Sequence, residues 1–127
     1  MKAHAQVALL LGMVATSGTA QEVDLGTGAV LRGLEKVSGD VENITLKNGG
    51  TAEFGHLRIA LGECRYPSGD PAADAFAFLT ITPRDAERPV FAGWMIASSP
   101  ALNALEHPRY DVWVLRCQTA APSEQTE

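Results

Sequence analysis

Short apolar segments separated by turn-forming residues run through most of the sequence, and this pattern restricts the fold more than any other feature. In the clearest segment, Tyr110–Cys117, apolar side chains alternate between two faces, as they do in a β-strand. One face is predicted to carry Tyr110, Val112 and Val114, and the other Trp113, Leu115 and Cys117. The other strand candidates are Ala29–Val37, Val41–Lys47, Thr51–Cys64, Phe76–Thr82 and Val90–Ala97.

Glycine, asparagine and proline indicate how these segments turn and connect. The sequence Asn48–Gly50 (NGG) predicts a hairpin turn between two strands. Gly33 and Gly55 each predict a bulge or bend, since glycine weakens the interior of a strand. Ser99-Pro100 predicts the start of a short helix, because serine caps a helix and proline suits its first position.

The number and spacing of these segments define the expected fold class. Six or seven short strands with one short helix predict an all-β protein, either a small β-sandwich or a barrel. A chain of 127 residues has room for one such domain, and no internal repeat is visible.

The first twenty residues have the three parts of a signal peptide. Lys2 gives a positive start, Val7–Ala15 is an apolar stretch, and Gly18 and Ala20 are small residues before a cleavage site. The stretch is too short to cross about 30 Å of hydrocarbon as a helix, and Gln21 in place of cysteine gives no support for a lipid anchor. A buried N-terminal helix is the alternative. The predicted organisation is a signal peptide at 1–20, a flexible lead-in at 21–28, a β-domain at 29–117 and a disordered tail at 118–127.

An exported chain predicts a disulfide between its two cysteines, Cys64 and Cys117. The chain-entropy model gives such a bridge about 4 kcal/mol of stabilisation as an upper figure. A reactive thiol pair is the alternative, but neither cysteine is part of a C-x-x-C motif or has a histidine close by in sequence. The predicted location is therefore the periplasm, with no transmembrane segment in the mature chain.

Charge and residue spacing exclude several classes of ligand. The net charge is −5, and the ten lysines and arginines are not clustered, so a nucleic-acid-binding face is not expected. His56 and His107 have no ligand spacing, and Asp70 and Asp74 are typical of a solvated loop. We therefore predict no metal site and no cofactor.

The densest group of chemically active residues lies in the segment from position 93 to position 117. A serine hydrolase would use Ser98 or Ser99 with His107 and a carboxylate, but the segment has no G-x-S-x-G elbow, and we assign no catalytic residue. The serines and His107 are interpreted as helix caps, Trp113 as a core residue, and Trp94 as a possible stacking platform. The binding candidates are Trp94, Ser98, Ser99, Glu106, His107 and Tyr110.

Three runs of sequence resemble a family of small exported proteins of Gram-negative bacteria that is catalogued as a domain of unknown function. They are AVLRGLEKVSG at Ala29–Gly39, FGHLRIALGEC at Phe54–Cys64 and GWMIASSPALNALEHPRYDVWVLRC at Gly93–Cys117. The resemblance implies a periplasmic location. Genes of that family often lie beside one for an accessory subunit of respiratory complex I, which implies a binding or assembly role.

Two functional hypotheses follow, and a purely structural role is a third possibility. The first is a non-catalytic binding or accessory module for an envelope protein or another envelope component, such as a component of a respiratory complex. The alternative is a small hydrolase that acts on cell-wall glycan or peptide and uses Glu106, His107 or Asp111.

Overall fold

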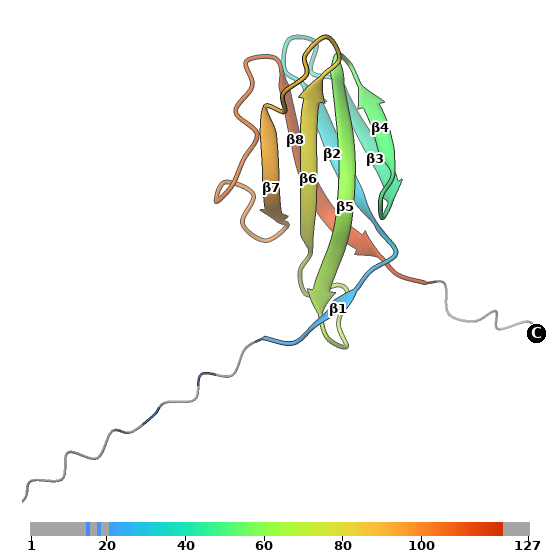
Figure 1. Ribbon diagram of the computed structural model, residues 1–127, viewed down its shortest axis with the longest axis vertical. Coiled ribbons are helices and arrows are strands. Elements are labelled where there is room, and N and C mark those ends of the chain that lie inside the picture. The colour runs from blue at the N-terminus through green and yellow to red at the C-terminus, as the bar shows by residue number, and fades with distance from the viewer. Residues whose placement is uncertain (1–14, 16–17, 19–20, 121–127) are drawn as a thin grey trace, which may run out of the picture.

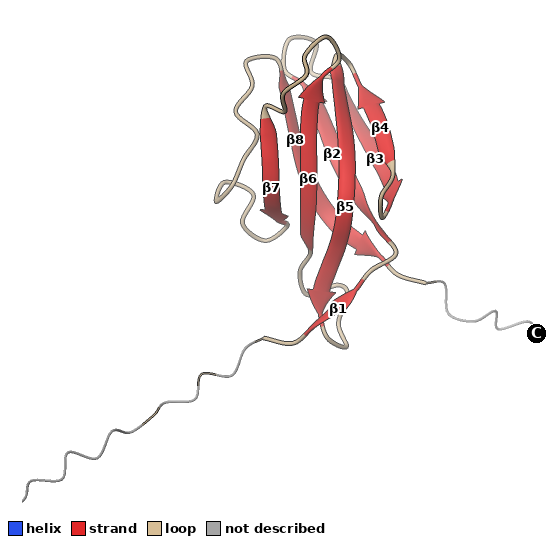
Figure 2. Cartoon of the chain, in the orientation of Figure 1, coloured by secondary structure: helices blue, strands red, loops and turns tan. Residues whose placement is uncertain are grey.

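A computed structural model describes residues 15, 18 and 21–120 of the chain. The predicted signal peptide, except for two positions, and residues 121–127 of the predicted tail lie outside the described residues. The described part is all-β and contains no helix, which confirms the fold class (Figure 2). The strands are β1 (Val23–Leu25), β2 (Gly28–Glu35), β3 (Val41–Lys47), β4 (Thr51–Phe54), β5 (Leu57–Pro67), β6 (Phe76–Pro83), β7 (Phe91–Ile96) and β8 (Tyr110–Gln118).

The strands form two separate antiparallel sheets that pack face to face (Figure 1). The larger sheet has the order β1-β5-β6-β7, with β4 also paired to β5, and the smaller sheet has the order β3-β2-β8. Because the sheets do not join into one closed ladder, the fold is a sandwich rather than a barrel. The largest fully buried side chains lie between the sheets and include Leu31, Leu57, Ile59, Leu79, Ile81, Val112 and Val114.

The predicted disulfide is present and links the two sheets. Cys64 on β5 is bonded to Cys117 on β8, and their Cα atoms are 5.6 Å apart. Both residues are buried and belong to the hydrophobic core. The bridge therefore fixes one sheet to the other with a covalent bond.

The Asn48–Gly50 turn does not form the predicted hairpin. It connects β3 to β4, but β3 pairs with β2 in the smaller sheet and β4 pairs with β5 in the larger one. The backbone amide of Asn48 donates to the Thr27 carbonyl at 3.0 Å, and the backbone amide of Gly49 donates to the Leu61 carbonyl at 2.8 Å. The chain thus crosses between the sheets here, because pairing with other strands competes successfully with the local hairpin.

Gly33 is not the site of the predicted bulge, whereas Gly55, predicted as a bulge or bend, lies in a turn that divides the predicted segment Thr51–Cys64 into β4 and β5. Gly55 begins the two-residue turn between β4 and β5 with a φ of +56°, a conformation that favours glycine. Any side chain at Gly55 would also collide with the ring of Tyr110. At Gly33, an added Cβ would lie 2.7 Å from the ring of Phe54, so this glycine permits a close approach to that ring.

The pairing of β2 with β8 contains a bulge at a different residue from the one predicted. This bulge changes the face of the sheet on which some β8 side chains lie. Val30 is opposite Arg116 and Leu31 is opposite Val114, so Leu115 is an extra residue in β8. Cys117 therefore points into the core with Val112 and Val114, although the alternation placed it on the other face. Trp113, predicted to be a core residue, is half-buried on the outside of the smaller sheet.

Two further segments differ from the sequence prediction. The helix expected after Ser99 is replaced by two successive turns, closed by bonds from the Ser99 amide to the Ile96 carbonyl and from the Leu102 amide to the Ser99 carbonyl. The chain then places Leu105 in the core at 4% exposure, and this anchor favours the extended path over a helix. The lead-in expected at 21–28 contains strand β1, which pairs with the end of β5.

Candidate functional site

The segment 97–109, which holds most of the candidate residues, runs along the side of the sandwich where β7 and β8 end their sheets (Figure 1). Polar contacts fix its first half to β7 of the larger sheet and to the loop before β6. The Asn103 side chain donates to the Trp94 carbonyl at 2.9 Å, and the Ser98 hydroxyl donates to Asp74 at 2.7 Å. Burial opposes ionisation of Asp74, but its hydrogen bonds from Ser98 and the Ala75 amide outweigh this effect and lower its pKa.

His107 is a structural acceptor in this segment. Its Nδ1 atom accepts the backbone amides of Arg109 at 3.0 Å and Tyr110 at 3.1 Å. This contact differs from the predicted helix cap, in which His107 would have met carbonyl oxygens. Because the Ser98 hydroxyl donates to Asp74 and the His107 Nδ1 atom accepts two backbone amides, these two side chains do not form a triad with each other.

Three other binding candidates occupy different environments. Tyr110 is 2% exposed, its hydroxyl accepts the His56 amide, and its ring packs edge-on against Phe54. It is therefore a core residue, and its side chain is not part of an exposed surface. Ser99 and Glu106 are exposed.

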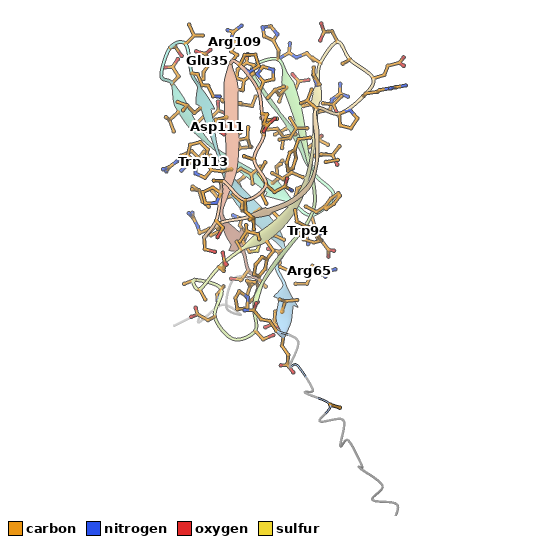
Figure 3. All side chains as sticks on the ribbon, turned by 90° about the vertical axis from the view of Figure 1, so that its left-hand side faces the viewer. Glu35, Arg65, Trp94, Arg109, Asp111 and Trp113 are labelled. Carbon is orange, nitrogen blue, oxygen red and sulfur yellow. A yellow bond between two sulfur atoms is a disulfide. The ribbon has the colours of Figure 1, made fainter. Side chains whose placement is uncertain are left out.

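An ion pair secures the end of the segment to the turn after β2. The Glu35 carboxylate accepts the Ser38 amide at 2.6 Å and the Arg109 Nε at 3.0 Å (Figure 3). Hydrogen bonds from the Ser38 side chain and amide, with a smaller contribution from Arg109, lower the pKa of Glu35 to about 2. Lys36 adds a bond from its ammonium group to the carbonyl of His107.

An exposed aromatic surface covers part of the outer face of the larger sheet. Trp94 on β7 is 37% exposed, its ring contacts Phe78 edge-on at 5.4 Å, and the Arg65 guanidinium lies 5.3 Å from its centroid. A groove of about 300 Å³ surrounds it. We call this surface the Trp94 face, and it is lined by Gln21, Val23, Arg65, Phe76, Trp94 and Ile96.

A second hollow lies beside the smaller sheet, between the segment 97–109 and the outer edge of β8. It has a volume of about 380 Å³, and we call it the β8 slot; its lining residues are Pro100, Ala101, Ala104, Asp111, Val112 and Trp113. Trp113 was not among the binding candidates. Period-two alternation assigned it to the same face as Cys117, and the sequence gives no signal for the bulge that separates them.

The described residues contain neither a metal-binding cluster nor a membrane-spanning helix. No three histidine, cysteine or carboxylate side chains within residues 21–120 are grouped closely enough to hold a metal ion. In the same part of the chain there is no helix with the length and apolar character needed to cross a bilayer.

These features define a class of protein: a small disulfide-linked β-sandwich with a hollow beside each sheet. The sequence profile of a family described as "Uncharacterized protein conserved in bacteria (DUF2155)" matches residues 29–117, and the chain belongs to this family. It is also 31% identical over 94 residues to "Uncharacterized protein RP359" of Rickettsia prowazekii (strain Madrid E). That alignment covers 72% of this chain and 61% of the Rickettsia protein. No solved structure matches the chain.

Proposed function

We propose that this protein is a non-catalytic binding module of the bacterial periplasm and that it docks onto an envelope protein through the Trp94 face. The observation that carries the proposal is the exposed apolar and aromatic surface on the larger sheet. Exposed apolar patches mark protein interaction sites, and tryptophan and arginine are enriched among the residues that dominate binding energy. Trp94 and Arg65 lie together on this surface.

The disulfide supports the proposed location. A bond between Cys64 and Cys117 persists in an oxidising compartment, whereas cytosolic reductants keep such thiols reduced. The leader-like sequence of residues 1–20 gives independent support. The respiratory-complex component implied by the family resemblance is one candidate partner.

The alternative of a small cell-wall hydrolase has less support. His107 uses Nδ1 to hold two backbone amides, and Ser98 donates its hydroxyl to Asp74. Neither side chain is arranged to activate the other.

Photocrosslinking of the exported protein in living cells tests the docking proposal. A benzoylphenylalanine at Phe76, which lines the groove, is expected to give a discrete crosslinked product with an envelope protein. A probe at Thr45, exposed on β3 of the other sheet, is the matched control and should give none.

The Trp94→Ala substitution, placed in the same probe-bearing chain, should abolish the product. Leu102→Ala removes another exposed apolar side chain, from the loop, and should leave the product unchanged. Equal products from both probe positions, or none at Phe76 when the protein is present in the periplasmic fraction, would refute the proposal.

A further inference from the structure

We propose that the β8 slot binds an extended peptide that adds a strand to the free edge of β8 and places a lysine or arginine side chain on Asp111. This site lies on the smaller sheet, apart from the Trp94 face, and does not rest on the role proposed for that face. Its occupant is defined by three features of the slot: an unpaired strand edge, a wall of small side chains and an unpartnered carboxylate.

The first feature is the outer edge of β8. Within residues 21–120, β8 pairs with β2 alone and ends its sheet. Its outward amides and carbonyls are therefore available, and another extended backbone is the partner that satisfies a row of such groups. Tyr110–Val114 lies before the bulge at Leu115, so this part of the edge keeps the regular spacing that strand addition requires.

The second feature is the wall opposite this edge. Pro100, Ala101 and Ala104 line the slot from the loop side, across from the strand residues. Their side chains are small, and the hollow they leave has a volume of about 380 Å³. A peptide lying along β8 would thus have a strand on one side and an apolar wall on the other. Figure 3 shows the molecule from this side, with Asp111 and Trp113 labelled on the strand.

The third feature is the charge of the slot. Asp111 is half-buried in the slot lining, and its carboxylate has no hydrogen bond or ion pair among the described side chains. A half-buried carboxylate in a largely apolar hollow has lost part of its hydration. An ion pair with a bound cation compensates for this loss. Trp113, two residues along the strand, points to the same side of the sheet and provides an apolar surface for a neighbouring side chain of the peptide.

A second copy of the chain is a poorer occupant of this edge. Two copies could pair through Tyr110–Val114, but this stretch contains no lysine or arginine. The only basic residue of β8 is Arg116, which lies beyond the bulge. Such a dimer would leave Asp111 without a cation, whereas a basic peptide satisfies both the edge and the carboxylate.

Selection from a displayed library of random twelve-residue peptides on the disulfide-bonded protein tests the proposal. We expect selected peptides to contain β-forming residues with at least one lysine or arginine. Asp111→Asn should weaken their binding by about tenfold, the effect expected for a hydrogen bond to a charged group. Glu42→Gln, which neutralises an exposed carboxylate on β3 at the opposite edge of the same sheet, is the control and should leave binding unchanged.

Backbone methylation separates strand addition from docking by side chains alone. Two synthetic versions of a selected peptide, N-methylated at odd or at even positions, should differ: one set removes the amides that face β8 and should abolish binding, and the other should bind. Amides in Tyr110–Val114 should exchange hydrogen more slowly when the peptide is bound.

Three outcomes would overturn the proposal. The first is peptides that bind Asp111→Asn and wild type equally, and the second is equal tolerance of both methylation patterns. The third is a stable dimer in sedimentation whose β8 amides are already protected, since a second copy would then occupy the edge. Peptides lost on Trp94→Ala but not on Asp111→Asn are a case of the first outcome, and they would support the Trp94 face.

Discussion

Removing the Cys64–Cys117 bond should strongly lower the free energy of unfolding. The size of this loss depends on the number of residues between the two cysteines. The two residues are 53 positions apart. The chain-entropy model gives a loop of this length about 4 kcal/mol at 25 °C, through loss of freedom in the unfolded state. Both cysteines are buried, so replacing both with alanine should cost a further 1–2 kcal/mol, roughly, for lost packing. A domain of this size has only about 5–15 kcal/mol in total.

Urea unfolding of three samples separates these two contributions. Oxidised protein compared with protein reduced by dithiothreitol gives the effect of the covalent bond, and reduced protein compared with Cys64→Ala/Cys117→Ala gives the packing effect. The urea dependence should also steepen after reduction, because an unfolded chain without the crosslink exposes more surface. A loss below about 1 kcal/mol on reduction, with an unchanged slope, would refute the entropic reasoning.

Three other substitutions test particular contacts. Gly55→Ala should lower the free energy of unfolding by about 1–3 kcal/mol or more, since it combines a φ of +56° with a collision against the Tyr110 ring; an unchanged urea midpoint would contradict this. Leu105→Ala should cost about 2–5 kcal/mol, whereas Leu102→Ala, at 74% exposure, should leave the urea midpoint nearly unchanged; equal effects would show that the loop is not anchored by Leu105. The Glu35 carboxylate, with its pKa lowered to about 2, stabilises the fold above its ordinary pKa of 4.5, and this contribution is lost as the pH falls from 4.5 through 2. Glu35→Gln should therefore flatten the acid-side fall in melting temperature over that window, and a parallel fall in both proteins would contradict the assignment.

Local sequence patterns were sufficient to predict the disulfide and most of the strands, although β1 was missed and β4 and β5 were predicted as one segment. The alternation of Val112 and Val114 with polar or outward residues is a property of a single strand, and it appears in the structure as predicted. The pairing of Cys64 with Cys117 required no geometry either, because there are only two cysteines. Features of this kind depend on a few neighbouring residues or on the number of cysteines.

Features that depend on distant partners could not be predicted in this way. Asn48–Gly50 has the composition of a hairpin turn, and only the partners of β3 and β4 show that it joins two sheets. Leu115 becomes a bulge residue because of its pairing with β2, and the facing of Trp113 relative to Cys117 changes as a result. The Trp94 platform was considered from the sequence, but the β8 slot was missed because it requires the bulge and the loop together.

The pairing of β2 with β8 has a consequence for how the chain folds. Gly28 is opposite Gln118, so the smaller sheet joins residues from the two ends of the domain. Its contact order is high. Such topologies fold slowly, because the entropy of closing a long loop is lost before the strand pairing can stabilise the sheet. Synthesis proceeds from the N-terminus, so β2, the central strand of this sheet, is made long before β8 and can pair with it only at the end. Any chain truncated before residue 110 would leave β2 with a permanently unpaired edge, and it is expected to aggregate or be degraded rather than fold in part.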